Sequence, residues 1–229
     1  MIFDPLYLMI LAPGILLGLW AQWKVKSAFA NTKQMPVSSR LTGAEAAARI
    51  LANHHLDHVG IEPANGMLGD HYDPRSKTLR LSPDVYNGRS IAAVGVAAHE
   101  AGHALQDQQR YAPLALRNGI VPMANVGSNL SWILLIIGMM MGSFQLMIAG
   151  VALFSIVVFF QLINLPVEFN ASSRARKILV TNGIITPSEE PAVAKVLNAA
   201  ALTYVAATIT AILTLLYFLI RSGLLGGRR

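Results

Sequence analysis

The chain has 229 residues, of which 54% are hydrophobic and only 13% are charged, and its formal net charge is +6. Soluble domains carry about a quarter charged residues, so this composition excludes disorder, a highly charged coiled coil and an ordinary soluble globule of this size. The positive charge suits nucleic acid or a membrane surface, and the apolar excess favours the membrane. The absence of cysteine excludes disulfides and thiolate zinc sites, so any metal site must use His, Asp or Glu.

Long charge-free stretches divide the sequence. There are three of them, with 19, 50 and 25 residues: 5–23, 118–167 and 196–220. A helix needs about 20 residues to cross about 30 Å of hydrocarbon, so the first and third stretches each predict one membrane span. The middle stretch is long enough for two, and the turn residues 142–145 predict a hairpin whose arms cover roughly 127–142 and 145–165. We therefore expect four spans.

The first stretch could also be a cleaved signal peptide, because Ala28-Phe29-Ala30 resembles a cleavage site. However, Asp4 precedes the stretch, whereas Lys24 and Lys26 follow it. That order of charges is typical of an uncleaved anchor whose N-terminus lies outside the cytoplasm. We therefore expect the segment to be retained.

The distribution of Lys and Arg predicts the orientation of the chain. Segments 24–117 and 168–195 together hold 15 of these residues, and the remaining 3 lie after residue 220. Since cytoplasmic loops collect positive charge, we expect both segments in the cytoplasm and both termini outside. The charge then serves membrane orientation, and nucleic acid binding is not needed to explain it.

Five parts are expected along the chain. They are a transmembrane anchor over 1–23, a cytoplasmic catalytic segment over 24–117, a transmembrane hairpin over 118–167, a second cytoplasmic segment over 168–195, and a transmembrane helix with a short tail over 196–229.

Local signals predict several elements in the first polar segment. Thr42 and Glu45 form a capping box, which predicts a helix that ends near Gly60. The alternating residues 78–81 predict a short strand, either an ordinary hairpin edge or an edge that binds extended substrate by strand addition. Small, helix-forming residues from Ser90 onwards predict a second helix.

This second helix contains the sequence His99-Glu100-Ala101-Gly102-His103, an H-E-x-x-H motif. Residues four apart share one helical face, so both imidazoles can bind one metal ion. Glu100 is then placed beside the metal, where it can act as a general base towards water. Zinc is the metal that this motif indicates, because it lowers the pKa of a bound water to about 7.

The motif is unlikely to arise by chance. Six His and six Glu among 229 residues give an expectation of roughly 0.004 such patterns. The alternative is a charged face on a solvated helix. The neighbouring residues 96–98 and 101–105 include no other charged side chain, and burying two unligated His and a Glu there would be costly. The zinc interpretation is therefore preferred.

A catalytic zinc ion needs three protein ligands and an open position. The extended H-E-x-x-H-x-x-G-x-x-H pattern fails, because Gln106 and Gln109 occupy its Gly and final His positions. Glu168 is the best candidate for the third ligand, since a carboxylate at a membrane boundary is costly without a cationic partner. The alternative is a membrane-edge carboxylate paired with Arg174 or Arg176.

The combination of the motif with Glu168-x-x-Ala171 resembles the gluzincin arrangement of HtpX-like and CAAX-prenyl-type membrane proteases. A closer resemblance is to the bacterial membrane-bound neutral zinc metallopeptidase family of YugP type. It rests on four segments: 70–75, 79–82, 97–100 and 166–172. This resemblance implies His99, His103 and Glu168 as zinc ligands, Glu100 as catalytic base and the plasma membrane of a prokaryote as the location.

Three more residues have open roles. HtpX-like proteases place Asp after the Ala of this motif, where it can orient a ligating His, whereas this chain has Ser172. The Ser172 hydroxyl can still form a hydrogen bond to such a His, although a weaker one. Arg174 or His71 could stabilise the developing oxyanion. Arg174 could equally pair with Glu168 or with lipid phosphate.

Another group of histidines, His54, His55 and His58, has helical spacing. No carboxylate pattern completes a metal site there, so positions on a helix surface are the preferred interpretation.

The sequence therefore predicts a mainly α, polytopic membrane protein with four transmembrane helices and a small α+β gluzincin-like catalytic domain. The expected function is zinc-dependent endopeptidase activity on membrane-associated or misfolded polypeptides. The alternatives are a zinc hydrolase of another amide or of a lipid-linked substrate, and a non-catalytic membrane scaffold with structural zinc. The expected partners are Zn²⁺, a polypeptide substrate and the lipid bilayer, without nucleic acid; a homo-oligomer or a membrane-protein partner is compatible with the sequence.

Overall fold

A computed structural model describes residues 4–64, 66 and 69–225. The chain forms two compact units. The span unit contains Met1–Ala21, Ala115–Pro166 and Thr203–Arg229, and the site unit contains Gln22–Leu114 and Val167–Leu202. The described residues are mainly helical, with one three-stranded sheet. This confirms the expected fold class, a mainly α polytopic protein with a small α+β portion.

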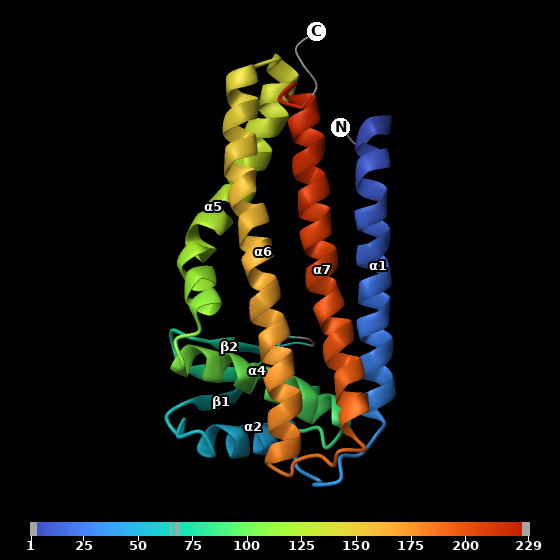
Figure 1. Ribbon diagram of the computed structural model, residues 1–229, viewed down its shortest axis with the longest axis vertical. Helices are drawn as coiled ribbons and strands as arrows, with labels where there is room; N and C mark the ends of the chain where they lie inside the picture. Colours follow the sequence, from blue (N-terminus) through green and yellow to red (C-terminus); the bar gives the residue numbers. More distant parts are fainter. Residues whose placement is uncertain (1–3, 65, 67–68, 226–229) are drawn as a thin grey trace. The chain divides into compact units, whose positions relative to one another are not determined.

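Four long helices supply the span unit (Figure 1). Their bounds are α1 (Pro5–Lys33), α5 (Ala112–Met141), α6 (Phe144–Thr181) and α7 (Glu190–Arg221). Each is long and apolar enough to cross a membrane, as the charge-free stretches predict. The expected hairpin turn joins α5 to α6, where Gly142 adopts a φ of +62°, a left-handed conformation that glycine adopts without steric cost.

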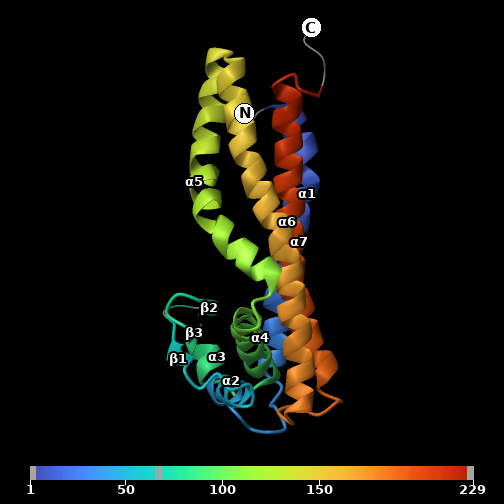
Figure 2. The same ribbon diagram turned by 60° about the vertical axis from the view of Figure 1, so that its left-hand side comes forward.

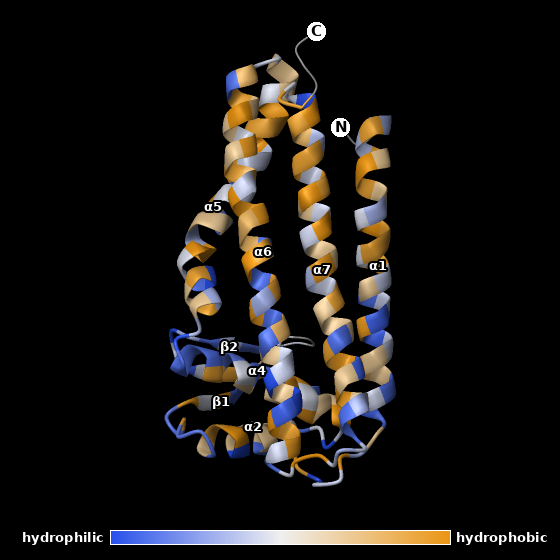
Figure 3. Ribbon diagram, in the orientation of Figure 1, coloured by the Kyte–Doolittle hydropathy of each residue, from blue (hydrophilic) through white to orange (hydrophobic). Residues whose placement is uncertain are grey.

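Small residues bring helices of the span unit close together. A Cβ atom at Gly150 on α6 would lie 2.6 Å from the Leu135 side chain of α5, and one at Gly14 on α1 would lie 2.8 Å from Thr210 on α7. Close approach at small residues is the usual way in which helices pack in lipid. Large apolar residues such as Met140 are exposed on these helices, as expected for contact with lipid, and the ribbon coloured by hydropathy is largely orange along them (Figure 3).

Helix α6 differs from the expectation that a polar segment begins after its span. It continues through Pro166 and ends only at Thr181, so Glu168 lies inside the helix. Proline removes one intrahelical hydrogen bond, but long helices of membrane proteins tolerate this loss where neighbours satisfy the freed group. Helices α5 and α7 likewise begin several residues before the charge-free stretches. The expected domain boundaries therefore remain predictions based on charge.

The sheet of the site unit has the strand order β1-β3-β2, with β1 (Gly60–Pro63), β2 (His71–Asp73) and β3 (Thr78–Leu81). β3 pairs in parallel with β1 and antiparallel with β2. The strand predicted at 78–81 is therefore confirmed, but it is the central strand. Both of its edges are occupied, so the idea that it binds substrate by strand addition is wrong.

Helix α2 (Gly43–Ala52) has the predicted capping box, in which Thr42 and Glu45 bond to each other's backbone N–H groups. It ends well before Gly60. His55 adopts a φ of +57°, and the Leu56 N–H donates to the Leu51 carbonyl. This is a Schellman-type termination. It places His54 and His55 in the turn after the helix, so the expectation of three histidines on one helix surface is wrong.

The remaining elements of the site unit are α3 (Pro83–Tyr86) and α4 (Ile91–Gln108). Ser90 caps α4 by accepting from the Ala93 N–H, which agrees with the helix predicted from Ser90. α4 packs against α2 and the sheet (Figure 2). Most of its residues are buried, in a core shared with the polar half of α6 through Ala175 and Leu179. The motif residues therefore lie on the central helix of this unit.

Candidate metal centre

Three potential metal ligands converge in the site unit. His99 and His103 lie one turn apart on α4, and Glu168 faces them from α6. Oε2 of Glu168 lies 3.2 Å from Nε2 of His99 and 3.6 Å from Nε2 of His103. One ligand atom from each residue lies within 4.8 Å of the others. The structure thus brings together the three residues that the sequence nominates as ligands.

The two helices approach closely beside this cluster. A Cβ atom at Gly102 would lie only 3.0 Å from the carbonyl oxygen of Ala171, which is closer than nearly all real Cβ contacts. Gly102 precedes His103 by one residue, and Ala171 follows Glu168 by three. The small residue on α4 therefore lets the backbone of α6 come near enough for Glu168 to reach both histidines.

The geometry of the cluster fits zinc. Two ligands at about 2.0–2.2 Å from a tetrahedral ion lie roughly 3.3–3.6 Å apart. The two measured separations from Glu168 to the histidines, 3.2 and 3.6 Å, agree with that spacing. The donor set of two imidazoles and one carboxylate is also common for catalytic zinc. The donor types and the two separations from Glu168 thus fit a zinc ion.

Burying charged side chains without a partner of opposite charge costs free energy, and two residues of the cluster are buried. The exposed fraction is 7% for His103 and 2% for Glu168. Burial acts to lower the pKa of His103, but its interaction with Glu168 and the negative charges of Glu100 and Glu168 outweigh this and raise the pKa above its ordinary value. The cluster therefore carries excess negative potential that attracts a cation.

Glu100 lies between the two histidines on α4 and is 7% exposed. Its carboxylate is close enough to act electrostatically on His103. A buried carboxylate beside a potential metal site is the position that a general base requires.

Ser172 has the place that its spacing predicts. Its Oγ atom lies 3.2 Å from Nδ1 of His99, on the side of the ring away from Glu168. A hydrogen bond at this ring nitrogen orients the imidazole and leaves Nε2 facing the cluster. The Ser172 hydroxyl is thus placed to orient the His99 ring.

Helices α4 and α6 also share a network of polar side chains that the sequence does not reveal. Gln106 is fully buried, and its Oε1 atom lies 2.9 Å from Nδ1 of His103. Nε2 of Gln106 donates to the Val167 carbonyl at 2.9 Å and to Oδ1 of Asn170 at 3.0 Å. In the sequence, Gln106 stands out only as a departure from the extended zinc motif. The sequence did offer one signal for the role of Gln106: it is a polar residue three positions after His103, on the same buried face of the helix.

The arginines near Glu168 have other partners. Arg174 donates to Oδ1 of Asn170 and Oε1 of Gln109, both at 2.6 Å, and its guanidinium lies 5.9 Å from the centre of a tyrosine ring. Arg176 pairs with Glu190 at 2.5 Å. The alternative in which Glu168 is a carboxylate neutralised by one of these arginines is therefore wrong.

His71 lies on the edge strand β2 and is exposed. Its Nδ1 atom is 2.7 Å from the Gly69 carbonyl. It is not one of the three clustered residues.

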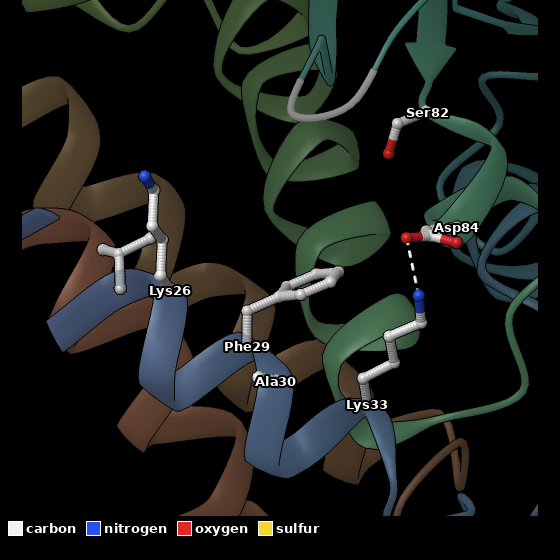
Figure 4. A pocket seen from close by; sticks show the side chains of 7 residues that line it. Lys26, Phe29, Ala30, Lys33, Ser82 and Asp84 are labelled. Carbon is white, nitrogen blue, oxygen red and sulfur yellow. Dashed lines mark hydrogen bonds and ion pairs between the residues drawn. The ribbon is translucent and has the colours of Figure 1, made fainter. Parts of the chain in front are cut away.

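A separate cavity of about 270 Å³ lies in the same unit, between the end of α1 and the start of α3. Val25, Phe29 and Ala30 line it, and Lys33 and Asp84 form a 2.6 Å ion pair at its edge (Figure 4). None of the cluster residues contributes to this lining. The candidate metal centre is therefore separate from this cavity.

Comparison with known proteins places the chain in a family. Residues 7–223 match the family described as "Putative neutral zinc metallopeptidase". The chain belongs to this family. It is also 52% identical over 213 residues to "Putative membrane protease YugP" of Bacillus subtilis (strain 168), covering 93% of this chain and 94% of the relative. No solved structure matches the chain.

Membership of the neutral zinc metallopeptidase family confirms the resemblance to proteins of YugP type. Together with the four apolar helices it supports a membrane location for this chain. The match includes both α4 and α6, so the whole cluster lies within the region shared with the family.

Proposed function

We propose that this chain is a membrane-embedded zinc-dependent endopeptidase. The observation that carries the proposal is the cluster of His99, His103 and Glu168, of which His103 and Glu168 are buried, together with the buried motif residue Glu100 on the same helix turn. A structural zinc site is normally closed by four protein ligands, whereas a catalytic one keeps a position open. The cluster found among the described residues has three, which favours catalysis over a structural role.

Each of these side chains has a defined task in peptide hydrolysis. His99, His103 and Glu168 would hold the ion. Zinc bound there would supply a Lewis acid that polarises the scissile carbonyl and lowers the pKa of water to about 7. The carboxylate of Glu100 takes a proton from the attacking water and passes it to the leaving nitrogen, a form of general acid–base catalysis.

The four helices suited to cross a membrane indicate the kind of substrate. Glu168 lies on α6, one of the four helices suited to cross a membrane, so the third ligand is covalently continuous with a span. A site tethered in this way favours membrane-associated or misfolded polypeptides over freely diffusing substrates. The excess of Lys and Arg in 24–117 and 168–195, 15 against 3 elsewhere, supports a cytoplasmic site, both termini outside, and the plasma membrane of a prokaryote.

Replacement of the base tests the enzyme class. In Glu100→Gln, the three ligands remain, so we expect purified protein to keep its zinc while peptide hydrolysis falls by at least about 100-fold, because the amide cannot accept the proton. Zinc content would be measured by elemental analysis, and hydrolysis with a fluorescent protein substrate and by self-cleavage. Glu62→Gln is the matched control, since Glu62 is a surface carboxylate, 58% exposed, on β1.

The outcomes separate the alternatives. Unchanged cleavage in Glu100→Gln would overturn the mechanism. Zinc in wild type without any peptide cleavage would favour a scaffold with structural zinc, or a hydrolase of a different amide or lipid-linked substrate, which membrane lipid extracts would reveal. Absence of zinc in wild type, with His99→Ala behaving identically, would overturn the metal site.

A further inference from the structure

The network behind His103 connects four side chains from two helices. It runs from Arg174 through Asn170 to Gln106 and ends at His103. Gln106 has no exposed surface, and Asn170 and Arg174 are partly buried. Amides and imidazoles are ambiguous in isolation, because their donor and acceptor atoms have similar shapes. Here each ambiguity is resolved by the preceding member of the network.

Arg174 determines the orientation of the Asn170 amide. A guanidinium can only donate hydrogen bonds, and Nε of Arg174 lies 2.6 Å from one terminal atom of Asn170. That atom must be the oxygen. Arg174 is itself held at two further points, by its bond to Gln109 and by its position over the Tyr111 ring, where a cation is attracted to the aromatic face.

The Gln106 amide is then oriented by two acceptors. One of its terminal atoms lies 2.9 Å from the Val167 carbonyl oxygen and 3.0 Å from the Asn170 oxygen. Only an amide nitrogen can satisfy both contacts, since it has two N–H groups. The other terminal atom, which faces His103, is therefore the acceptor oxygen. A flipped amide would place three oxygens together in a buried site, which is strongly unfavourable.

The oxygen of Gln106 requires a proton on Nδ1 of His103, 2.9 Å away. When Nδ1 carries the proton of a neutral imidazole, Nε2 presents its lone pair, and Nε2 is the atom that faces Glu168. We propose that Gln106 is a positioning residue that selects the metal-binding tautomer of His103, and that Asn170 and Arg174 hold Gln106 in the required orientation. This inference rests on the zinc site of the proposed function.

The two histidines differ in this respect. Nδ1 of His99 contacts the hydroxyl of Ser172. Because a hydroxyl can either donate or accept a hydrogen bond, this contact is compatible with both tautomers of His99. The arrangement around His103 permits one tautomer only. The network also assigns Arg174 a positioning role, because its Nε group bonds to Asn170 while its Nη1 group is held by Gln109.

Zinc affinity of the purified full-length protein tests the proposal. In Gln106→Met, a side chain of similar length fills the space but cannot accept from His103. We expect zinc affinity, measured by competition with a chelating dye, to fall by about 10- to 100-fold, the usual effect of removing a partner of a ligating His. Gln106→Glu keeps an acceptor for His103 but sets its second oxygen against the Val167 carbonyl and the Asn170 oxygen, so we expect zinc affinity to fall in this variant as well. Gln108→Met is the matched control, because Gln108 lies on the same helix but is exposed and donates to the His54 carbonyl, outside the network.

A spectroscopic measurement distinguishes positioning from loss of structure. In zinc-loaded wild type with ¹⁵N-labelled histidine, the Nδ1 proton of His103 is buried and hydrogen-bonded, so we expect a slowly exchanging resonance. We expect that resonance to be lost in Gln106→Met, while the metal-free protein still unfolds cooperatively near the wild-type temperature. Arg174→Met tests the outer end of the network without altering the core, and should lower zinc affinity less than Gln106→Met does.

Each result has a definite meaning. Wild-type zinc affinity and an unchanged Nδ1 resonance in Gln106→Met would overturn this inference alone, provided that wild type binds zinc. An equal loss in Gln108→Met would also overturn it, because the effect would not be specific to the network. If Gln106→Met fails to fold, unchanged affinity and resonance in Arg174→Met would overturn the proposed chain of orientation. Failure of wild type to bind zinc would overturn the proposed function itself, and this inference with it.

Discussion

At the residue scale, each histidine of the candidate metal centre contacts a second polar side chain. The imidazole of His99 contacts a hydroxyl and that of His103 contacts an amide, and both contacts are made at Nδ1. In each case the outer hydrogen bond leaves Nε2 free to face Glu168. The strength and polarity of these outer groups should therefore set how tightly zinc is held.

Substitution of Ser172 tests this view. Because the hydroxyl is a weak partner, we expect Ser172→Ala to reduce zinc affinity by less than about 10-fold. Ser172→Asp places a carboxylate beside Nδ1 of His99, and we expect it to raise zinc affinity above that of wild type. Dye competition on both variants checks the order. Equal affinity in all three proteins would show that Ser172 does not act on His99.

At the element scale, the crossing of α4 and α6 builds the cluster, since neither helix carries all three ligands. Two glycines on α4 contact neighbouring helices in different ways. At Gly102, an added Cβ would lie 3.0 Å from a backbone oxygen of α6, whereas at Gly95 it would lie 3.3 Å from the Val193 side chain of α7. A side chain can rotate away, but a helix backbone must move as a whole.

This contrast predicts different results for two alanine substitutions. We expect Gly102→Ala to separate α4 from α6 by a few tenths of an ångström and to lower zinc affinity severalfold, since ligating groups need placement within about 0.5 Å. We expect Gly95→Ala to keep wild-type affinity and to gain up to about 1 kcal/mol from helix propensity. Thermal unfolding and dye competition measure both effects. Loss of zinc by Gly95→Ala to the same degree would contradict the role assigned to the crossing.

At the scale of the whole molecule, orientation in the membrane is open to direct measurement, because the natural chain has no cysteine. We expect Arg75→Cys, in the exposed turn after β2, to resist an impermeant thiol reagent in intact cells. We expect Met141→Cys to react, since Met141 is 71% exposed at the end of α5. Permeabilised cells supply the control, in which both variants should be labelled. The reverse pattern in intact cells would place the site outside the cytoplasm.

Local patterns predicted much of the molecule. The four long helices follow from the charge-free stretches, the α2 start from its capping box, and the pairing of His99 with His103 from helical spacing. The approach of Glu168 followed from the need for a third ligand. These inferences succeeded because charge, capping and periodicity act within a few residues.

Features that depend on tertiary contact were not predicted. The early end of α2 depends on the backbone of His55 in a left-handed conformation, and the passage of α6 through Pro166 opposes the local preference of proline. The network of Gln106, Asn170 and Arg174 joins residues more than sixty positions apart. Such contacts are decided by packing between helices, which a single sequence does not display.

The division of the ligands between α4 and α6 has a consequence for biosynthesis. The ribosome completes His99 and His103 first, and Glu168 follows 65 residues after His103. At about 5–20 residues per second, the nascent chain spends several seconds with two of the three ligands. During that interval the residues of the hairpin, α5 and most of α6, are made and must enter the bilayer. If the proposed function is correct, the three candidate ligands are complete only after the hairpin has been synthesised.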